Sequence, residues 1–226
     1  SAKFLTNTNS SKIVSCSADG MIRYIDLERK TKSSFLCNNG ITFEMVADPI
    51  DSNVFFSCCE DGTVKQFDLR IKTCCECNFC NENTIVKLKK NRTSANIAIA
   101  SLAFKPTDPT IFSIGCWDSY VRSFDRRMIK DNEPFYQICP SYLKKKRNQS
   151  TFPLNEESKF KITCLRYSND GNEMLVSYSN EGVYLVHPNS PDDETSYQFP
   201  EVTPMNDSGY NFFFLSFFLS CFQFFQ

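Results

Sequence analysis

The sequence predicts an all-β fold in which one short unit recurs in tandem. Three observations support this prediction: four segments resemble paired strands around an acidic turn, the turns recur along the chain, and no segment shows a long helical period. The four segments are IVSCSADGMIRYIDLER from Ile13, FFSCCEDGTVKQFDLR from Phe55, IFSIGCWDSYVRSFDRR from Ile111 and EMLVSYSNEGVYLVHP from Glu173.

Each of these segments is expected to form a β-hairpin. Asp-Gly or Glu-Gly between two apolar runs is a strong hairpin signal, and we interpret it as a two-residue turn. Glycine adopts a positive φ without steric cost, and a short acid can hydrogen-bond the turn backbone. The turn acids Asp19, Asp61 and Asp118 are therefore expected to be structural.

The spacing of the turns indicates the kind of repeat. Asp19 and Asp61 are 42 residues apart, within the roughly 40–45 residues of a WD-type propeller blade. The next two intervals, which end at Asp118 and Glu181, are 57 and 63 residues and indicate insertions in the same unit. In three copies a second acid follows the turn acid after seven residues, which fixes the length of the intervening strand. These second acids are Asp26, Asp68 and Asp125.

Further strands are expected outside the hairpins. Apolar segments precede the last three hairpins, and they begin at Ile41, Ile97 and Ile162. The polar stretch TSYQF from Thr195 is expected to supply an outer strand, whereas the first unit is expected to lack its innermost strand. Three or four short antiparallel strands per unit predict an incomplete β-propeller, an open arc of about four blades. Such an arc leaves the sheet faces at its two ends without a neighbouring blade.

The predicted propeller covers residues 1–200, with a long loop at about residues 128–160. Residues 201–226 are expected to form a non-propeller tail that ends in NFFFLSFFLSCFQFFQ. The apolar run of this tail is shorter than the roughly 20 residues that span a bilayer. No membrane association is therefore expected.

Composition argues against several classes of function. A formal net charge of −1 predicts no general attraction to nucleic acid or anionic lipid. With a single His and no Gly-rich phosphate loop, the chain is not expected to be an enzyme or to bind a cofactor. The basic run YLKKKR, Tyr142 to Arg147, is either a nuclear-import signal or a solvated loop. No signal peptide is evident at the start, and we expect a protein of the nucleus, the cytoplasm or both.

Four cysteines cluster in CCECNFC: Cys74, Cys75, Cys77 and Cys80. One tight loop would have to supply all four ligands to a zinc ion, whereas structural zinc sites more often combine two separated pairs. We therefore expect a thiol-rich loop at an outer blade edge and no metal, with zinc as the alternative. Cysteines inside apolar runs, such as Cys58 and Cys116, are expected to be reduced and to pack as small hydrophobic groups.

The stretches EDGTVKQFDLR and WDSYVRSFDRR resemble the ending of WD repeats, with Phe67 and Phe124 in place of the usual Trp. More narrowly, residues from about Ala2 to Pro188 resemble the IQ-motif and WD-repeat group of nuclear receptor interaction proteins. That group belongs to the substrate receptors of cullin-RING ubiquitin ligases, the DCAF class. The likeness is carried by IVSCSADG, FFSCCEDGTVKQFDLRIKT, GCWDSYVRSFDRRMI and ITCLRYSNDGNEMLVSYSNEGVYLVHP.

The resemblance implies two site residues. Receptors of this class use an aromatic-Asp-x-Arg ending, whose Arg contacts the double-propeller adaptor of the ligase. Arg70 after Asp68 and Arg127 after Asp125 fit this pattern, whereas the first unit has Glu28 in place of the Arg. The alternative is a surface salt bridge between each Arg and its acid, worth roughly 0–1 kcal/mol. Asp68 and Asp125 are expected to hold the turn or to orient the Arg.

The function expected from the resemblance is therefore that of a non-catalytic scaffold, a substrate receptor that links a target protein to a cullin-RING ligase. The target could be a nuclear receptor. The alternative is a WD-repeat coregulator that binds a nuclear receptor without any ligase.

Overall fold

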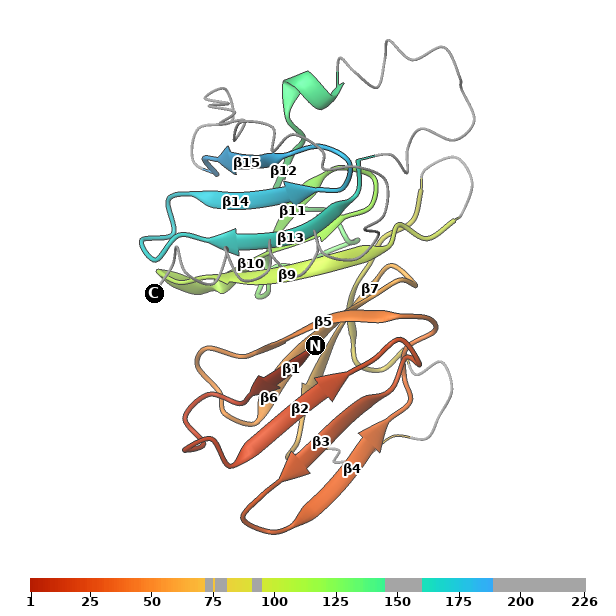
Figure 1. Cartoon of the computed structure of the whole chain (residues 1–226), viewed down its shortest axis with the longest axis vertical. Coiled ribbons are helices and arrows are strands. Elements are labelled where there is room, and N and C mark those ends of the chain that lie inside the picture. The colour runs from red at the N-terminus through yellow and green to blue at the C-terminus, as the bar shows by residue number, and fades with distance from the viewer. Residues whose placement is uncertain (72–74, 76–80, 91–94, 145–159, 189–226) are drawn as a thin grey trace, which may run out of the picture.

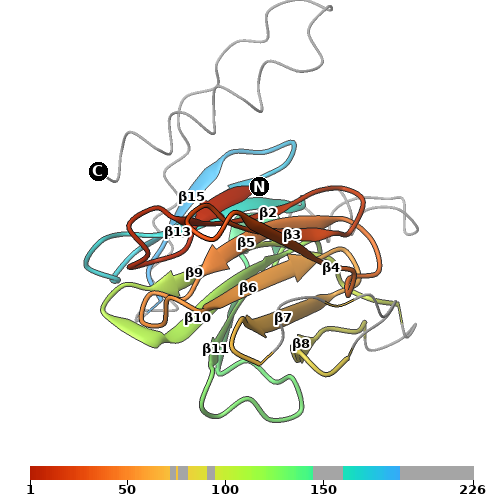
Figure 2. The ribbon, with the colours of Figure 1, turned by 90° about the horizontal axis from the view of Figure 1, so that it is seen from below.

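The chain forms four antiparallel β-sheets that follow one another in chain order (Figure 1). The computed structural model describes residues 1–71, 75, 81–90, 95–144 and 160–188. Within each sheet, hydrogen-bonded neighbours are also neighbours in sequence, as the second sheet shows in the view from below (Figure 2). We call the sheets blades 1 to 4. They confirm the predicted all-β, incomplete propeller.

The strands are short, and their bounds follow the predicted units. Blade 1 contains β1 (Ala2–Phe4), β2 (Lys12–Cys16), β3 (Ile22–Asp26) and β4 (Thr31–Phe35). Blade 2 contains β5 (Thr42–Ala47), β6 (Val54–Cys59), β7 (Thr63–Asp68) and β8 (Thr84–Lys87). Blade 3 contains β9 (Ile99–Lys105), β10 (Asp108–Cys116), β11 (Val121–Asp125) and β12 (Tyr136–Ile138). Blade 4 contains β13 (Ile162–Tyr167), β14 (Met174–Tyr178) and β15 (Val183–Val186).

The second and third strands of every blade form the predicted hairpins, but their turns are longer than two residues. Five residues separate β2 from β3. In this loop the N–H of Gly20 donates to the carbonyl of Ser17 at 3.2 Å, and the carboxylate of Asp19 accepts the N–H of Met21 at 2.9 Å. The two-residue prediction was wrong because the Asp-Gly pair is only the centre of a wider loop built around a β-turn.

Glycine is needed at the centre of the first two loops. Gly20 and Gly62 have φ values of 76° and 77°, in the left-handed region that costs other residues roughly 1–2 kcal/mol. A Cβ atom on Gly62 would also lie 2.7 Å from the carbonyl oxygen of Leu88. In blades 3 and 4 the left-handed positions belong to Ser119 and Asn180, so a non-glycine residue takes that conformation there.

Two further expectations are wrong. Blade 1 does have an innermost strand, because β1 pairs with β2. Ala2 lies opposite Ser15 and Phe4 lies opposite Ile13. The segment 128–160 is not all loop, because β12 lies within it and pairs with β11. Each of these strands has only three residues, too few to show an alternating pattern in the sequence. The expected outer strand at Thr195 and the tail 201–226 lie outside the described residues.

Among the residues that the structure describes, the hydrophobic core consists of three clusters, and each cluster fills the space between two successive blades. Blades 2, 3 and 4 each pack one face against the preceding blade. On that face, the first three strands of the blade each contribute one side chain to a row of three cross-strand neighbours. We call this the back row. The back rows are Ala47, Phe55 and Phe67 in blade 2; Phe104, Phe112 and Phe124 in blade 3; Tyr167, Met174 and Val186 in blade 4.

Aromatic pairs dominate two of these interfaces. Phe55 and Phe67 stack with ring centroids 4.9 Å apart, and Phe35 of blade 1 meets Phe67 edge-on at 5.1 Å. In blade 3 Phe112 and Phe124 repeat the stack at 5.6 Å. Such pairs contribute roughly 0.5–1.5 kcal/mol beyond the burial of their area. The two Phe residues that replace the usual Trp therefore hold neighbouring blades together.

Innermost strands of blades 2, 3 and 4 are linked by a polar network. The carboxylate of Glu44 on β5 accepts hydrogen bonds from Ser101 Oγ at 2.7 Å and from the backbone N–H of Leu102 at 3.1 Å. Its other oxygen pairs with Nη2 of Arg166 on β13 at 2.5 Å. Ser101 Oγ in turn accepts the N–H of Leu165 at 3.0 Å. Glu44 thus satisfies donors from both following blades.

The cysteines that the structure describes are free thiols, and all but Cys164 are buried. Burial raises the pKa of the Cys116 thiol to about 12, so it stays protonated and packs as an apolar group. Of the cysteine cluster only Cys75 is described. It is buried and forms a parallel bridge to Phe35, the last residue of the outer strand of blade 1. In the described part of the chain no helix has the length and apolarity needed to cross a bilayer.

Candidate functional site

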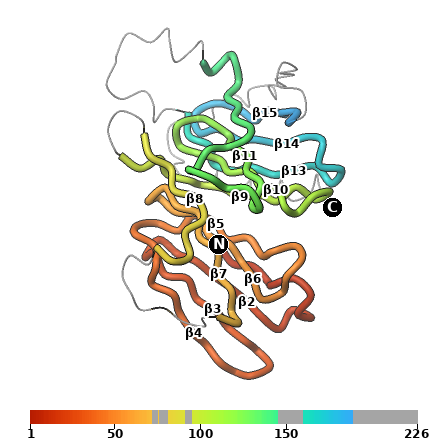
Figure 3. Tube along the Cα trace, turned by 180° about the vertical axis from the view of Figure 1, so that it is seen from behind, coloured from red at the N-terminus to blue at the C-terminus, as the bar shows by residue number. Residues whose placement is uncertain are grey.

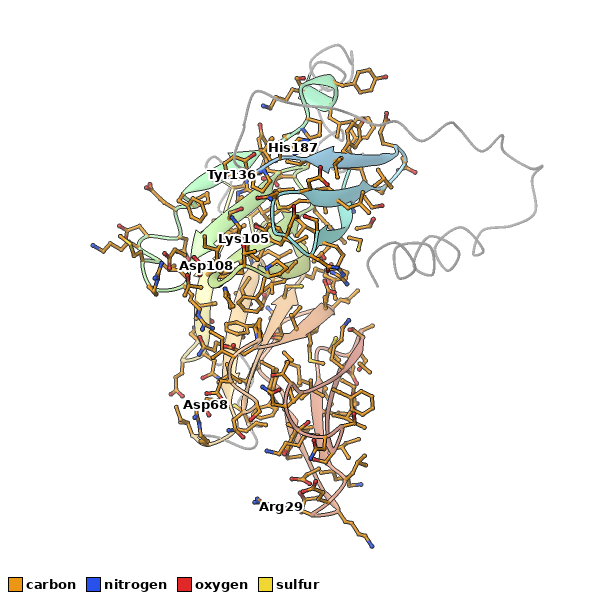
Figure 4. The ribbon with its side chains drawn as sticks, turned by 90° about the vertical axis from the view of Figure 1, so that its left-hand side faces the viewer. Arg29, Asp68, Lys105, Asp108, Tyr136 and His187 are labelled. Atoms are coloured by element: carbon orange, nitrogen blue, oxygen red, sulfur yellow. The ribbon has the colours of Figure 1, made fainter. Side chains whose placement is uncertain are left out.

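The sequence-predicted arginines lie at the ends of equivalent strands in two adjacent blades. Asp68 is the last residue of β7 and Asp125 the last residue of β11, and each Arg follows two residues later. Figure 4 shows Asp68 and Asp108, which belong to blades 2 and 3, along one side of the molecule. The two strand ends therefore present their turns on a shared face, which we call the arginine face.

Arg70 is held by acids from two different loops. Asp68 accepts three hydrogen bonds from this residue: its backbone N–H and its Nε at 2.9 Å, and its Nη2 at 2.7 Å. Nη2 also donates to Asp51, in the loop between β5 and β6, at 2.7 Å. These contacts lower the pKa of Asp68 and raise that of Arg70, chiefly through their mutual hydrogen bonds. The guanidinium is thus fixed in one orientation before any partner arrives.

Arg127 repeats this geometry in blade 3. Asp125 accepts its backbone N–H at 2.9 Å, its Nε at 3.0 Å and its Nη2 at 2.6 Å. The pKa of Asp108 is lowered mainly by a hydrogen bond from Thr110, and the positive charge of Arg127 lowers it further. Each strand-end acid therefore both caps the turn and orients the Arg.

Both guanidinium groups remain accessible despite these contacts. The side chains of Arg70 and Arg127 are 57% and 62% exposed. Each is followed by an apolar residue that is even more exposed: Ile71 at 86% and Met128 at 71%. A preorganised planar cation beside an exposed apolar side chain is a combination that protein interfaces favour. These apolar neighbours were not predicted, although the sequence places an apolar residue directly after each Arg.

Neighbouring arginines have different environments. Arg126 turns inward, and its Nη1 donates to the buried carboxylate of Asp48 at 2.6 Å, which links blade 3 to blade 2. In blade 1 the backbone N–H of Arg29 donates to Asp26 at 2.9 Å, but its Nε lies 3.9 Å from that carboxylate. Blade 1 therefore lacks the fixed guanidinium of blades 2 and 3, as its sequence ending implied.

The turn acids lie in the hairpin loops between the second and third strands and hold them. Asp19 pairs with Arg23 at 2.7 Å, and Asp118 pairs with Arg122 at 2.5 Å. In blade 2 the residue at the matching position, Lys65, is buried and donates to the carbonyl of Cys37 instead. Each of these cations follows its turn acid by four residues. The role of these cations was not predicted, although the sequence shows the constant spacing.

No group of three or more metal-ligating side chains occurs among the described residues. Three of the four cysteines of the zinc alternative, Cys74, Cys77 and Cys80, lie outside the described residues, so that alternative stays a prediction.

We expect the pKa of Asp125 to identify the preformed ion pair in solution. Hydrogen bonds from Arg127 lower this pKa from 3.8 to about 2. Because the folded pKa is depressed, the stabilising contribution is complete above the unfolded value and is lost as pH falls towards 2. A carboxyl ¹³C NMR titration should give a pKa of about 2 for Asp125 in the intact chain and a higher pKa in Arg127→Ala, which loses the side-chain donors but keeps the backbone N–H of residue 127 as a donor. An unchanged value in that variant would show that Arg127 does not hold the acid.

Comparison with known proteins places the chain among repeat proteins. The family model for the WD domain, G-beta repeat, matches residues 46–68, the segment from the end of β5 to Asp68. The chain is a WD-repeat protein. It is homologous to DDB1- and CUL4-associated factor 6 from Homo sapiens, at 37% identity over 203 residues and 83% of this chain.

Two further proteins are also similar to this WD-repeat protein. The mouse form of DDB1- and CUL4-associated factor 6 is 36% identical over 83% of the chain, and WD repeat protein iqw1 of Schizosaccharomyces pombe is 28% identical over the same share. The chain spans only 21% of the length of the human and mouse relatives and 25% of the yeast one.

Proposed function

We propose that this WD-repeat protein is part of a non-catalytic substrate receptor, and that its arginine face contacts the adaptor of a cullin-RING ubiquitin ligase. The observation that carries the proposal is the repeated geometry of Arg70 and Arg127, which are fixed in the same way on adjacent blades. The human and mouse relatives are named for their association with DDB1 and CUL4. We infer that DDB1 is the double-propeller adaptor that this face binds.

The chemistry of the face suits such a contact. Arg offers a planar fork of donors to carboxylates and carbonyls and is enriched in interface hot spots. Because Asp68 and Asp125 already fix the two guanidinium groups, little side-chain entropy remains to be lost on binding. The exposed side chains of Ile71 and Met128 supply apolar area beside each cation. We propose that the bound target is recognised elsewhere on the arc and that it is a protein such as a nuclear receptor.

Binding of the chain to purified DDB1 tests the proposal. Truncating a hot-spot Arg costs about 2 kcal/mol, so Arg70→Ala and Arg127→Ala should each weaken binding about 30-fold. Arg29→Ala is the matched control, because Arg29 follows the equivalent strand of blade 1 but has no fixed guanidinium. Biolayer interferometry with immobilised adaptor measures all of these variants.

Three outcomes separate the hypotheses. Loss of binding in the Arg70→Ala, Arg127→Ala double variant, with Arg29→Ala unchanged, supports the assigned face. Unchanged binding of the double variant shows that the adaptor binds elsewhere on the chain. Capture of a nuclear receptor by wild-type chain that does not bind DDB1 favours the coregulator without a ligase.

A further inference from the structure

Asp48 is a buried carboxylate that supports both loops of the arginine face. It directly follows β5 and begins the connection of residues 48–53 that leads to β6. Its side chain is only 3% exposed, so a partner protein cannot reach it. Blade 3 is stacked on blade 2 in the view from behind (Figure 3), and the two oxygens of this carboxylate serve different blades.

One oxygen, Oδ1, shapes the loop that supports Arg70. It accepts the backbone N–H of Ile50 at 2.8 Å and that of Asp51 at 3.3 Å. An Asp that accepts N–H groups two and three residues later bends the chain into a tight turn. This turn brings Asp51 to Nη2 of Arg70 at 2.7 Å. The second acceptor of the Arg70 guanidinium is therefore held in place through Asp48.

The other oxygen, Oδ2, holds the turn that carries Arg127. It pairs with Nη1 of Arg126, the residue directly before Arg127, at 2.6 Å. Two contacts further along bind the same segment to blade 2. Asn132 Oδ1 accepts the backbone N–H of Lys87 at 2.7 Å, and Ile129 packs against the cluster between blades 2 and 3. Blade 2 thus anchors this turn, and the ion pair is the anchor nearest to Arg127 in the chain.

We propose that Asp48 is a positioning residue that sets the orientation and separation of Arg70 and Arg127. A rigid partner can bind both guanidinium groups only if their separation matches that of its own acceptors, because the second contact depends on the geometry left by the first. The side chains of a binding site also need neighbours that lock their orientation. The effect on adaptor binding rests on the proposed function, whereas the fixed geometry is a property of the free chain.

Guanidinium ¹H–¹⁵N NMR spectra of the free chain test the positioning without any partner. In Asp51→Ala the Nη signals of Arg70 should shift, because Arg70 loses its second acceptor. Asp48→Ala should produce a similar shift, although the hydrogen bonds of Asp48 do not include Arg70. Asp48→Asn retains an acceptor oxygen for the loop and should leave the Arg70 signals unchanged. Wild-type signals of Arg70 in a folded Asp48→Ala chain would overturn the proposal.

Binding to purified DDB1 tests whether this positioning matters at the interface. Asp48→Asn removes the charge that pairs with Arg126 and should weaken binding about fivefold, the order expected when one more side chain must be ordered by the partner. In a chain that already carries Arg127→Ala, the same substitution should have no further effect. Equal weakening in both backgrounds would show a general structural role and would overturn the proposal.

Glu44→Ala is the matched control for the loss of a buried acid. Glu44 also pairs with an Arg of a later blade, but its contacts are made between innermost strands. This variant should leave the Arg70 signals and DDB1 binding unchanged. A shift of the Arg70 signals in Glu44→Ala as large as that in Asp48→Ala would count against a specific role of Asp48. A wild-type chain that does not bind DDB1 would overturn the proposed function alone, because the spectra decide the positioning separately.

Discussion

Replacing Phe112 with alanine is expected to lower the free energy of unfolding by about 4 kcal/mol, within the range for removing a buried Phe ring. Phe112 is completely buried between blades 2 and 3, where it stacks on Phe124 and meets Phe104 at 6.0 Å. Its removal leaves a cavity between two sheets whose backbones are fixed by their own hydrogen bonds. The interface therefore cannot collapse to fill the space.

Urea denaturation followed by circular dichroism measures this loss. Phe135→Ala serves as the control, because it removes the same ring from an exposed position and should change the free energy by less than about 0.5 kcal/mol. The loss of a folded baseline for Phe112→Ala would agree with the expectation, since about 4 kcal/mol is a large part of the stability of a small protein. Equal midpoints for the two variants would contradict the view that the space between blades is the core.

Glu44→Ala is expected to cost about 3 kcal/mol, because it breaks a mostly buried ion pair and leaves other donors unsatisfied. The substitution removes the acceptor of Ser101 Oγ, of the Leu102 N–H and of the Arg166 guanidinium at once. Arg166 retains some exposure and can turn towards water, which keeps the expected loss at the lower end of the range for buried pairs.

A double-mutant cycle with Arg166→Ala isolates the ion pair from the other two contacts. We expect a coupling energy of about 1–2 kcal/mol between Glu44 and Arg166 in urea unfolding, and a remaining cost for Glu44→Ala even when Arg166 is absent. The remainder measures the Ser101 and Leu102 contacts. A coupling energy near zero would mean that solvent screens the pair.

Patterns close together in the chain predicted most of the fold. The four hairpins were predictable because turn acid, apolar strand and strand-end acid lie within one short segment. The length of the turns was not predictable, because it depends on which backbone N–H donates a hydrogen bond to the Asp19 carboxylate. The Glu44 network was hidden for another reason: Glu44 lies in an apolar run, and its partner Arg166 is 122 residues away.

The candidate site was predictable to the same degree. The resemblance to WD-repeat substrate receptors indicated both guanidinium groups, because Asp68 with Arg70 and Asp125 with Arg127 match the ending of that class, whereas the spacing alone favours a surface salt bridge. The second acid on Arg70 is Asp51, which comes from a different loop and has no sequence signal of its own. Arg126 and Arg127 are adjacent and chemically identical, and only the fold decides that the first binds Asp48 while the second faces water.

The bridge between Phe35 and Cys75 connects blades in a second way. Leu36 N–H donates to the carbonyl of Cys75 at 2.7 Å, and Cys75 N–H donates to the carbonyl of Ser34 at 3.0 Å. Cys75, which lies between β7 and β8 of blade 2 in the sequence, therefore hydrogen-bonds at the outermost strand of blade 1. Separating the first sheet from the second breaks main-chain bonds as well as side-chain packing. We therefore expect blades 1 and 2 to open as one cooperative unit, with their amides becoming accessible to solvent together.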